Sequence, residues 1–176
     1  MKVRDFYQTI YDMIGDATPL STDCGKLCGS KCCEETDAGE GMYLFPREER
    51  LYRTHMADNR FKIYPTDLYT ELDRCVYLYT CRGCCDRALR PLGCRIFPLV
   101  PYKKPGGALS IILDPRGAQG LCPLAAGDIR NLNEEFVRAV TRAMQFAVKN
   151  KEVCRFIEVQ TMELLEPLLE KSAKNL

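Results

Sequence analysis

The stretch Asn133–Lys149, NEEFVRAVTRAMQFAVK, carries the clearest secondary-structure signal in this chain of 176 residues. Phe136, Val140 and Met144 recur at helical spacing, and charged or amide side chains fall on the opposite face. The first residue of the stretch is an asparagine, a favoured N-cap because its side chain accepts a hydrogen bond from the first helical N–H groups. The pattern therefore predicts an amphipathic helix over Glu134–Lys149.

Two further helices are predicted at the ends of the chain. One starts at Lys151 and should bend or restart at Pro167, because proline lacks an N–H and its ring clashes with the preceding turn. The other covers Val3–Ile14, which has the same helical period, and Gly15 is its expected stop. We expect residues 128–172 to form a helical cap that backs the middle of the chain with apolar side chains.

The middle of the chain has short apolar runs between turn residues in place of a helical period. Three of these runs are predicted as short strands, Phe61–Tyr64, Cys75–Thr80 and Leu109–Leu113. A single domain is expected for residues 1–176, since domains commonly have about 150 residues. The predicted fold class is α+β, with short strands, an N-terminal helix and two C-terminal helices packed as a cap.

Charge and apolar content exclude several classes of protein. Lys and Arg total 25 and Asp and Glu total 24, so the net charge is +1 and binding to nucleic acid through bulk charge is not expected. No apolar run is long enough to cross a membrane, and the charged N-terminal residues do not resemble a signal peptide. A cytoplasmic protein is therefore expected, with a protein partner left open.

Cysteine is the unusual component, with 11 residues in the chain. An odd number of cysteines in a reducing compartment is explained better by metal ligation than by a disulfide framework. Cys154 is set apart, because it lies within a predicted helix and is expected to be a buried core residue. Cys75 lies in an apolar run, and its role stays ambiguous.

The remaining nine cysteines are the candidate metal ligands, and residues 24–124 are the expected metal-binding core around which the small, irregular domain is organised. Glycine-rich loops can curl around zinc or a [4Fe–4S] cluster, both of which thiolates bind. The candidates form a first block of Cys24, Cys28, Cys32 and Cys33, a second block of Cys81, Cys84, Cys85 and Cys94, and a last site at Cys122.

Other roles for residues in this region, such as a redox pair or a catalytic histidine, fit the sequence less well than metal binding. Cys81 and Cys84 have the spacing of a redox pair, but no βαβ pattern surrounds them. His55, the single histidine, is better explained as a surface residue than as a ligand or base. Four arginines among the second-block cysteines are expected to stabilise an anionic thiolate site, with binding of an anionic substrate as the alternative. They are Arg82, Arg87, Arg90 and Arg95.

The spacing of the cysteines resembles that of a known family. Cys24-x3-Cys28-x3-Cys32-Cys33 is followed by Cys84-x5-Arg90-Pro91-x2-Cys94-Arg95-x-Phe97-Pro98 and then by Cys122. This is similar to the CxxCxxCC zinc- or iron-chelating family, the YkgJ-like cysteine-cluster proteins, whose members include flagellin lysine N-methylase. The resemblance covers residues 24–124.

The resemblance implies metal binding through the matched cysteines. These are Cys24, Cys28, one of Cys32 and Cys33, Cys84, Cys94 and Cys122, while Cys81 and Cys85 have less secure counterparts. Gaps of three residues replace the family's gaps of two in the first block, which lengthens each loop. Adjacent cysteines diverge along an extended backbone, so one of Cys32 and Cys33 is expected to ligate while the other packs behind it or serves a second metal.

The predicted function is therefore a metal-binding protein that holds zinc, or alternatively a [4Fe–4S] cluster, through its thiolates. The resemblance implies a metalloenzyme of the protein-lysine N-methylase or redox type as one alternative, and a metal-trafficking protein is another. The chain has no nucleotide fingerprint, so an enzymatic role rests on analogy. We also predict that one metal site draws ligands from both blocks, because neither block has enough apolar residues to hold a conformation alone.

Overall fold

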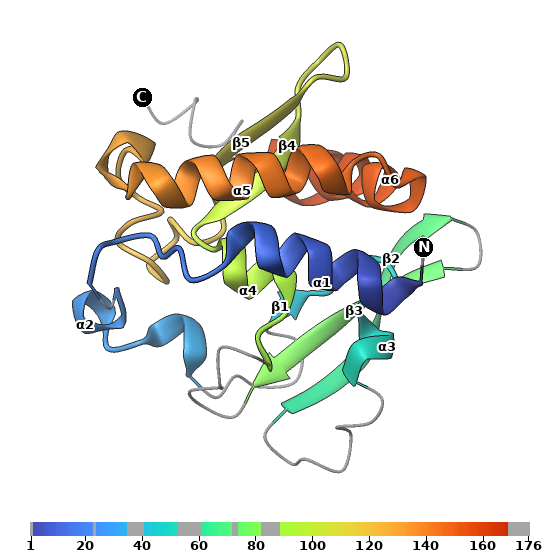
Figure 1. The fold of residues 1–176 in the computed structure, drawn as a ribbon, viewed down its shortest axis with the longest axis horizontal. Coiled ribbons are helices and arrows are strands. Elements are labelled where there is room, and N and C mark those ends of the chain that lie inside the picture. Colours follow the sequence, from blue (N-terminus) through green and yellow to red (C-terminus); the bar gives the residue numbers. More distant parts are fainter. Residues whose placement is uncertain are drawn as a thin grey trace.

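The computed structural model describes residues 2–22, 24–34, 41–52, 61–71, 74–81 and 89–168. Helices and short antiparallel strands together form an α+β fold, as the sequence predicted (Figure 1). Within these residues, no helix is long and apolar enough to cross a membrane.

Three helices supply most of the core. They are α1 (Val3–Ile14), α5 (Glu134–Ala147) and α6 (Lys151–Gln160). The helix predicted for α5 is confirmed and ends two residues earlier than expected, and Asn133 caps it by accepting a hydrogen bond of 3.0 Å from the N–H of Glu135. The shorter helical elements are α2 (Gly25–Cys28), the 3-10 turn η1 (Lys31–Cys33), α3 (Glu49–Tyr52), α4 (Leu92–Ile96), the 3-10 turn η4 (Ile129–Asn131) and the π-helical turn η5 (Thr161–Leu165).

The ends of α1 and α6 differ in how the helix stops. Gly15 has a φ of 55° and its N–H donates to the carbonyl of Tyr11 (2.8 Å), so α1 ends at the glycine that the sequence predicted. After α6 the chain continues directly into the π-helical turn η5. The π-helical turn covers Thr161–Leu165, so the helix departs from regular α geometry earlier than the position predicted from Pro167.

Two small antiparallel sheets lie against the helices. The strands are β1 (Met42–Tyr43), β2 (Phe61–Glu71), β3 (Arg74–Cys81), β4 (Leu99–Lys103) and β5 (Leu109–Leu113). The first sheet has the order β1-β3-β2, and the second pairs β4 with β5. The three predicted strands are confirmed within β2, β3 and β5, whereas the sequence did not predict β1 or β4. Because β4 pairs with β5 alone, Pro101 can occupy it without interrupting a ladder on both sides.

The main core lies between the long helices and the strands. Helix α1 packs along α5, as Figure 1 shows, and α6 packs on β2 and β4. Tyr7, Ile10, Phe136 and Phe156 are at most 1% exposed in this core. A second, smaller cluster joins α3 to the first sheet, and its members are Leu44, Tyr52, Phe61 and Tyr79.

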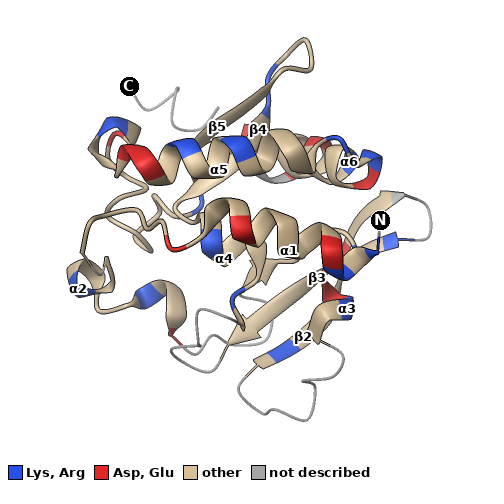
Figure 2. Cartoon of the chain, viewed as in Figure 1, with Lys and Arg blue, Asp and Glu red and all other residues tan. Residues whose placement is uncertain are grey.

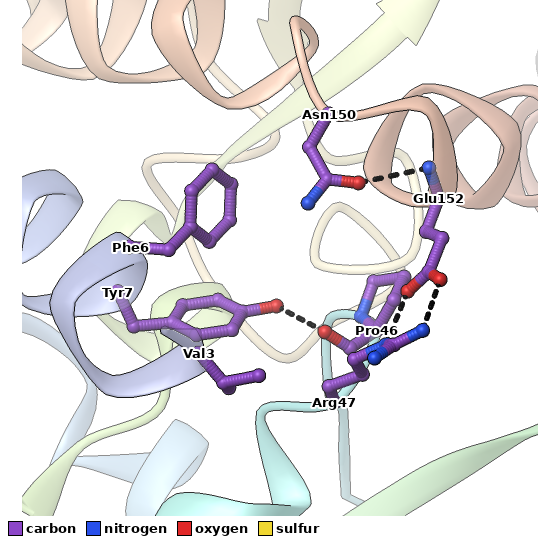
Figure 3. A pocket seen from close by; sticks show the side chains of 7 residues that line it. All are labelled: Val3, Phe6, Tyr7, Pro46, Arg47, Asn150 and Glu152. Atoms are coloured by element: carbon purple, nitrogen blue, oxygen red, sulfur yellow. Dashed lines mark hydrogen bonds and ion pairs between the residues drawn. The ribbon is translucent and has the colours of Figure 1, made fainter. Parts of the chain in front are cut away.

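Glu152, in the first turn of α6, connects the helices to the first sheet. Arg47 donates to its carboxylate through Nε (2.6 Å) and Nη2 (2.5 Å), and Arg74 of β3 donates to the same group. The hydrogen bonds from Arg47 hold the pKa of Glu152 below its usual range. Figure 3 shows this ion pair beside a cavity of about 230 Å³, where the Tyr7 hydroxyl donates to the carbonyl of Pro46 (2.7 Å). These polar groups hold the elements around the cavity together, so we interpret it as a packing gap.

Charged residues of both signs lie along α1, α5 and α6 (Figure 2). On α5, for example, Glu134 lies 3.6 Å from Arg138, one helical turn further along. Helices α1 and α6 likewise carry both acidic and basic residues. These three helices therefore face solvent with mixed charge, as the net charge of +1 leads one to expect.

Candidate functional site

The first cysteine block folds into two successive tight turns. Between α2 and η1, Gly29 and Ser30 have φ angles of 66° and 62°. These two left-handed residues reverse the chain, and the N–H of Ser30 donates to the carbonyl of Gly25 (2.9 Å). The reversal gathers the four cysteines of the first block onto one small coil.

The thiols of this coil interact with one another. The sulfur atoms of Cys32 and Cys33 lie 4.0 Å apart. The pKa of Cys32 is raised most strongly by its hydrogen bond with Cys33, then by partial burial, and further by the neighbouring thiols of Cys33, Cys28 and Cys24. Thiolates that oppose one another's ionisation in this way are stabilised together by a bound cation, which supplies the missing positive charge.

The distance between the sulfurs of Cys32 and Cys33 fits a single metal ion. A tetrahedral zinc ion with Zn–S bonds of about 2.3 Å holds its ligand sulfurs about 3.8 Å apart. The prediction that these two side chains diverge is wrong, because it assumed an extended backbone and η1 is a 3-10 turn. Both sulfurs can therefore face the same ion.

The described cysteines of the later blocks come from three different elements. Cys81 ends β3 and Cys94 lies on α4, and both are half-buried. Cys122 is buried in the loop after β5, where its N–H donates to the carbonyl of Gly117 (2.8 Å). In Figure 1 this loop and α2 appear on the same side of the molecule.

The structure places the four cysteines of the first block on one coil, with the sulfurs of Cys32 and Cys33 4.0 Å apart, but it does not complete the predicted ligand set. Cys84, Cys85, His55, Arg82 and Arg87 lie outside the described residues. Among the residues described, no group of three or more His, Cys, Asp or Glu side chains has the arrangement of a formed metal site. The contribution of the second block to a metal site therefore stays a prediction.

Arg95, next to Cys94 on α4, contacts α1. Its guanidinium carbon lies 4.1 Å from the centroid of the Tyr11 ring, and its Nε donates to the carbonyl of Arg90 (2.8 Å). A guanidinium group over an aromatic face is attracted by the electrons of the ring. These contacts direct the Arg95 side chain toward α1, and its stabilisation of an anionic thiolate site stays a prediction.

A buried carboxylate that the sequence analysis missed lies behind these residues. Glu48 is 0% exposed and accepts hydrogen bonds from the N–H of Phe45 (3.0 Å), the N–H of Leu92 (2.6 Å) and the hydroxyl of Tyr11 (2.6 Å). Burial raises the pKa of Glu48 to about 7, although these hydrogen bonds and the charge of Arg95 oppose the shift. Glu48 thus links α1, α3 and α4 through one side chain.

The two tyrosines near Glu48 are also held in their neutral form. Burial raises the pKa of Tyr11, and Glu48 raises it further. The pKa of Tyr52 is raised mainly by burial, then by Glu48, and in part by Cys94, so this hydroxyl lies close to the second cysteine block. Both side chains therefore act as hydrogen-bonding hydroxyls at neutral pH.

A cleft of about 760 Å³ opens beside this network, between α1, α3 and α4. Tyr11, Tyr52 and Arg95 line it, together with Arg4 from α1 and Arg50 from α3. It is more than three times the volume of the packing gap beside Glu152. The cleft is large enough for a small-molecule ligand, because such sites commonly measure about 300 to 1,000 Å³.

Cys154→Ala is expected to lower the free energy of unfolding by about 1 kcal/mol and to leave the metal content unchanged. Cys154 is only half-buried on α6, so the expectation of full burial is wrong, and its sulfur lies 3.7 Å from a carboxylate oxygen of Glu158. Urea denaturation and metal analysis of the variant test this. A loss of metal would contradict the separation of Cys154 from the other cysteines.

Comparison of the chain with known protein families, with curated proteins and with solved structures finds no match.

Proposed function

We propose that this chain is a metal-binding protein and that thiolates of the first cysteine block, together with Cys94 of the second block, hold the metal. The proposal rests on the coil of Cys24, Cys28, Cys32 and Cys33. In this coil the other three thiols raise the pKa of Cys32. The coil contains no buried side chain, so it has little packing energy of its own. A bound metal ion supplies that energy, as it does in small zinc domains.

Zinc is the metal that the coil fits best. The separation of 4.0 Å between the sulfurs of Cys32 and Cys33 suits two ligands of one tetrahedral ion. Each iron of a [4Fe–4S] cluster takes one cysteine, so adjacent ligand sulfurs would have to reach different irons. A [4Fe–4S] cluster is therefore the alternative cofactor, and it requires Cys32 and Cys33 to separate.

The proposal places the protein in the cytoplasm and gives the metal a structural role. A reducing compartment keeps thiols available as ligands, whereas an oxidising one favours their pairing as disulfides. Four thiolates around zinc leave no open coordination position for a substrate. A metalloenzyme or a metal-trafficking protein instead needs one ligand position to be free or exchangeable.

Elemental analysis and an absorbance spectrum of the full chain, purified without oxygen, test the proposal. We expect a colourless protein that contains zinc in a fixed ratio to the chain. Broad absorbance near about 400 nm with bound iron would assign the site to an iron–sulfur cluster instead. A chain that folds and carries neither metal would contradict the proposal.

A further inference from the structure

The cleft between α1, α3 and α4 collects positive charge from three elements. Arg4 is exposed on α1 and has no ion pair within the described part of the chain. Arg50 of α3 is exposed and lies 3.7 Å from Glu49, a long contact for an ion pair. Arg95 of α4 also lines the cleft. The lining of the cleft therefore carries three guanidinium groups against two carboxylates, which leaves an excess of positive charge.

The wall that carries these charges is held in place by the hydrogen bonds behind it. The Tyr11 hydroxyl donates to the buried carboxylate of Glu48, and the Arg95 guanidinium stacks on the same ring. Tyr52 is 5% exposed and packs in the aromatic cluster behind α3. A site whose side chains are fixed before binding loses less conformational entropy when the ligand arrives.

The spacing along α1 indicates the size of the ligand. Arg4 and Tyr11 are seven residues apart, which corresponds to about 10 Å along a helix axis. Asp12 and Asp16 line the cleft toward the C-terminal end of α1 and repel an anion there. The favourable region for negative charge therefore extends from Arg4 to Arg95 and stops before the two aspartates.

We propose that this cleft binds a small elongated molecule with an anionic group at each end, held by Arg4 and Arg50 at one end and by Arg95 at the other. The body of the molecule lies along α1 between these two ends. Carboxylate and phosphate groups share the chemistry that guanidinium groups recognise. Arg4 and Arg50 come from neither cysteine block, whereas Arg95 adjoins Cys94, so the metal content is measured alongside ligand binding.

Titration of the isotopically labelled, metal-loaded chain tests the proposal, with the arginine side-chain N–H signals followed by NMR. Suberate is the dicarboxylate probe, fructose 1,6-bisphosphate is the phosphate probe, and succinate is a shorter dicarboxylate for comparison. We expect saturable binding of suberate or the bisphosphate with a Kd of about 1 mM or below. Succinate should bind roughly tenfold more weakly because it cannot span the cleft.

Arg50→Gln is expected to weaken binding roughly tenfold, because one charged hydrogen-bonding partner is lost. Arg138→Gln is the matched control, since Arg138 is exposed on α5 and lies outside the cleft. It should change the Kd less than about twofold. The metal content should be the same in both variants, so failure here is distinguishable from failure of the metal site.

Three results would overturn the proposal. The first is the absence of saturation by either long probe, and the second is equal weakening by Arg50→Gln and Arg138→Gln, which indicates nonspecific screening. The third is saturable binding of the dication cadaverine in place of the anions, which would assign the cleft to Asp12 and Asp16. Preference for suberate over the bisphosphate, or the reverse, identifies which anionic group the cleft selects.

Discussion

Glu48→Ala should lower the free energy of unfolding by about 4 kcal/mol. Glu48 is fully buried, and its removal leaves two backbone N–H groups, of Phe45 and Leu92, and the Tyr11 hydroxyl without their acceptor. Each buried donor that loses its partner costs about 1 to 3 kcal/mol, and the cavity adds to this. Urea denaturation of the variant measures the loss.

Glu134→Ala is the matched control for this experiment. The Glu134 side chain is 83% exposed at the start of α5 and makes only a long ion pair with Arg138. Its replacement should change the stability by less than about 0.5 kcal/mol. A small effect at Glu48 as well would show that the carboxylate does not hold α1, α3 and α4 together.

Glu48 also makes the free energy of unfolding depend on pH, and it lowers that free energy as the pH rises. Burial raises the pKa of Glu48 from its ordinary value of 4.5 to about 7, so between these values the folded chain binds a proton that the unfolded chain has lost. The contribution of Glu48 is therefore fully present below pH 4.5 and is lost as the pH rises through 7.

Glu48→Gln removes this titration while keeping the shape of the side chain. The wild type should lose about 3 kcal/mol relative to the variant between pH 4.5 and pH 7. The pH dependence of the thiolates is common to the two proteins and therefore cancels in the comparison. A wild type that instead gains stability over this range would show that the three donors outweigh burial and keep Glu48 ionised.

The parts of the fold that the sequence predicted are those that local spacing determines. Helices α1 and α5 follow from apolar residues that recur along a continuous stretch, and the end of α1 follows from Gly15. Strand β4 was missed because Pro101 looks like a turn residue when its neighbours are unknown. Its place in a two-stranded sheet depends on pairing with β5, which no local pattern reveals.

In the candidate site, too, local spacing predicted some features and the rest depend on the tertiary fold. The gathering of the first-block cysteines was predictable, because short gaps and a glycine keep them close whatever the rest of the fold does. Convergence of Cys32 and Cys33 was not, since it depends on the 3-10 turn η1, which no local pattern predicted. The burial and hydrogen bonding of Glu48 could not be predicted from its neighbours, because its partners Tyr11 and Leu92 lie 37 and 44 residues away in sequence.

Cys28→Ser and Cys94→Ser should each remove nearly all of the bound metal if one ion takes ligands from both blocks. The binding energy at stake is on the order of 10 kcal/mol for a structural zinc site, so its loss should also unfold the coil of the first block. The double variant should then lose no more metal than either single variant. Metal-to-protein ratios measured by elemental analysis provide the comparison, with Cys154→Ser as a control that keeps its metal.

The alternative of one self-contained site in each block predicts a different pattern. Each single variant would then keep about half of the metal, and the two losses would add in the double variant. We expect the shared site on physical grounds, because α2 and η1 contain no buried side chain that would hold the coil in place. Helix α4, in contrast, is anchored by Leu92 and Ile96, which are 0% and 2% exposed. A metal bridging the two blocks therefore fastens the coil to a part of the fold that is already fixed, which a site within the coil alone cannot do.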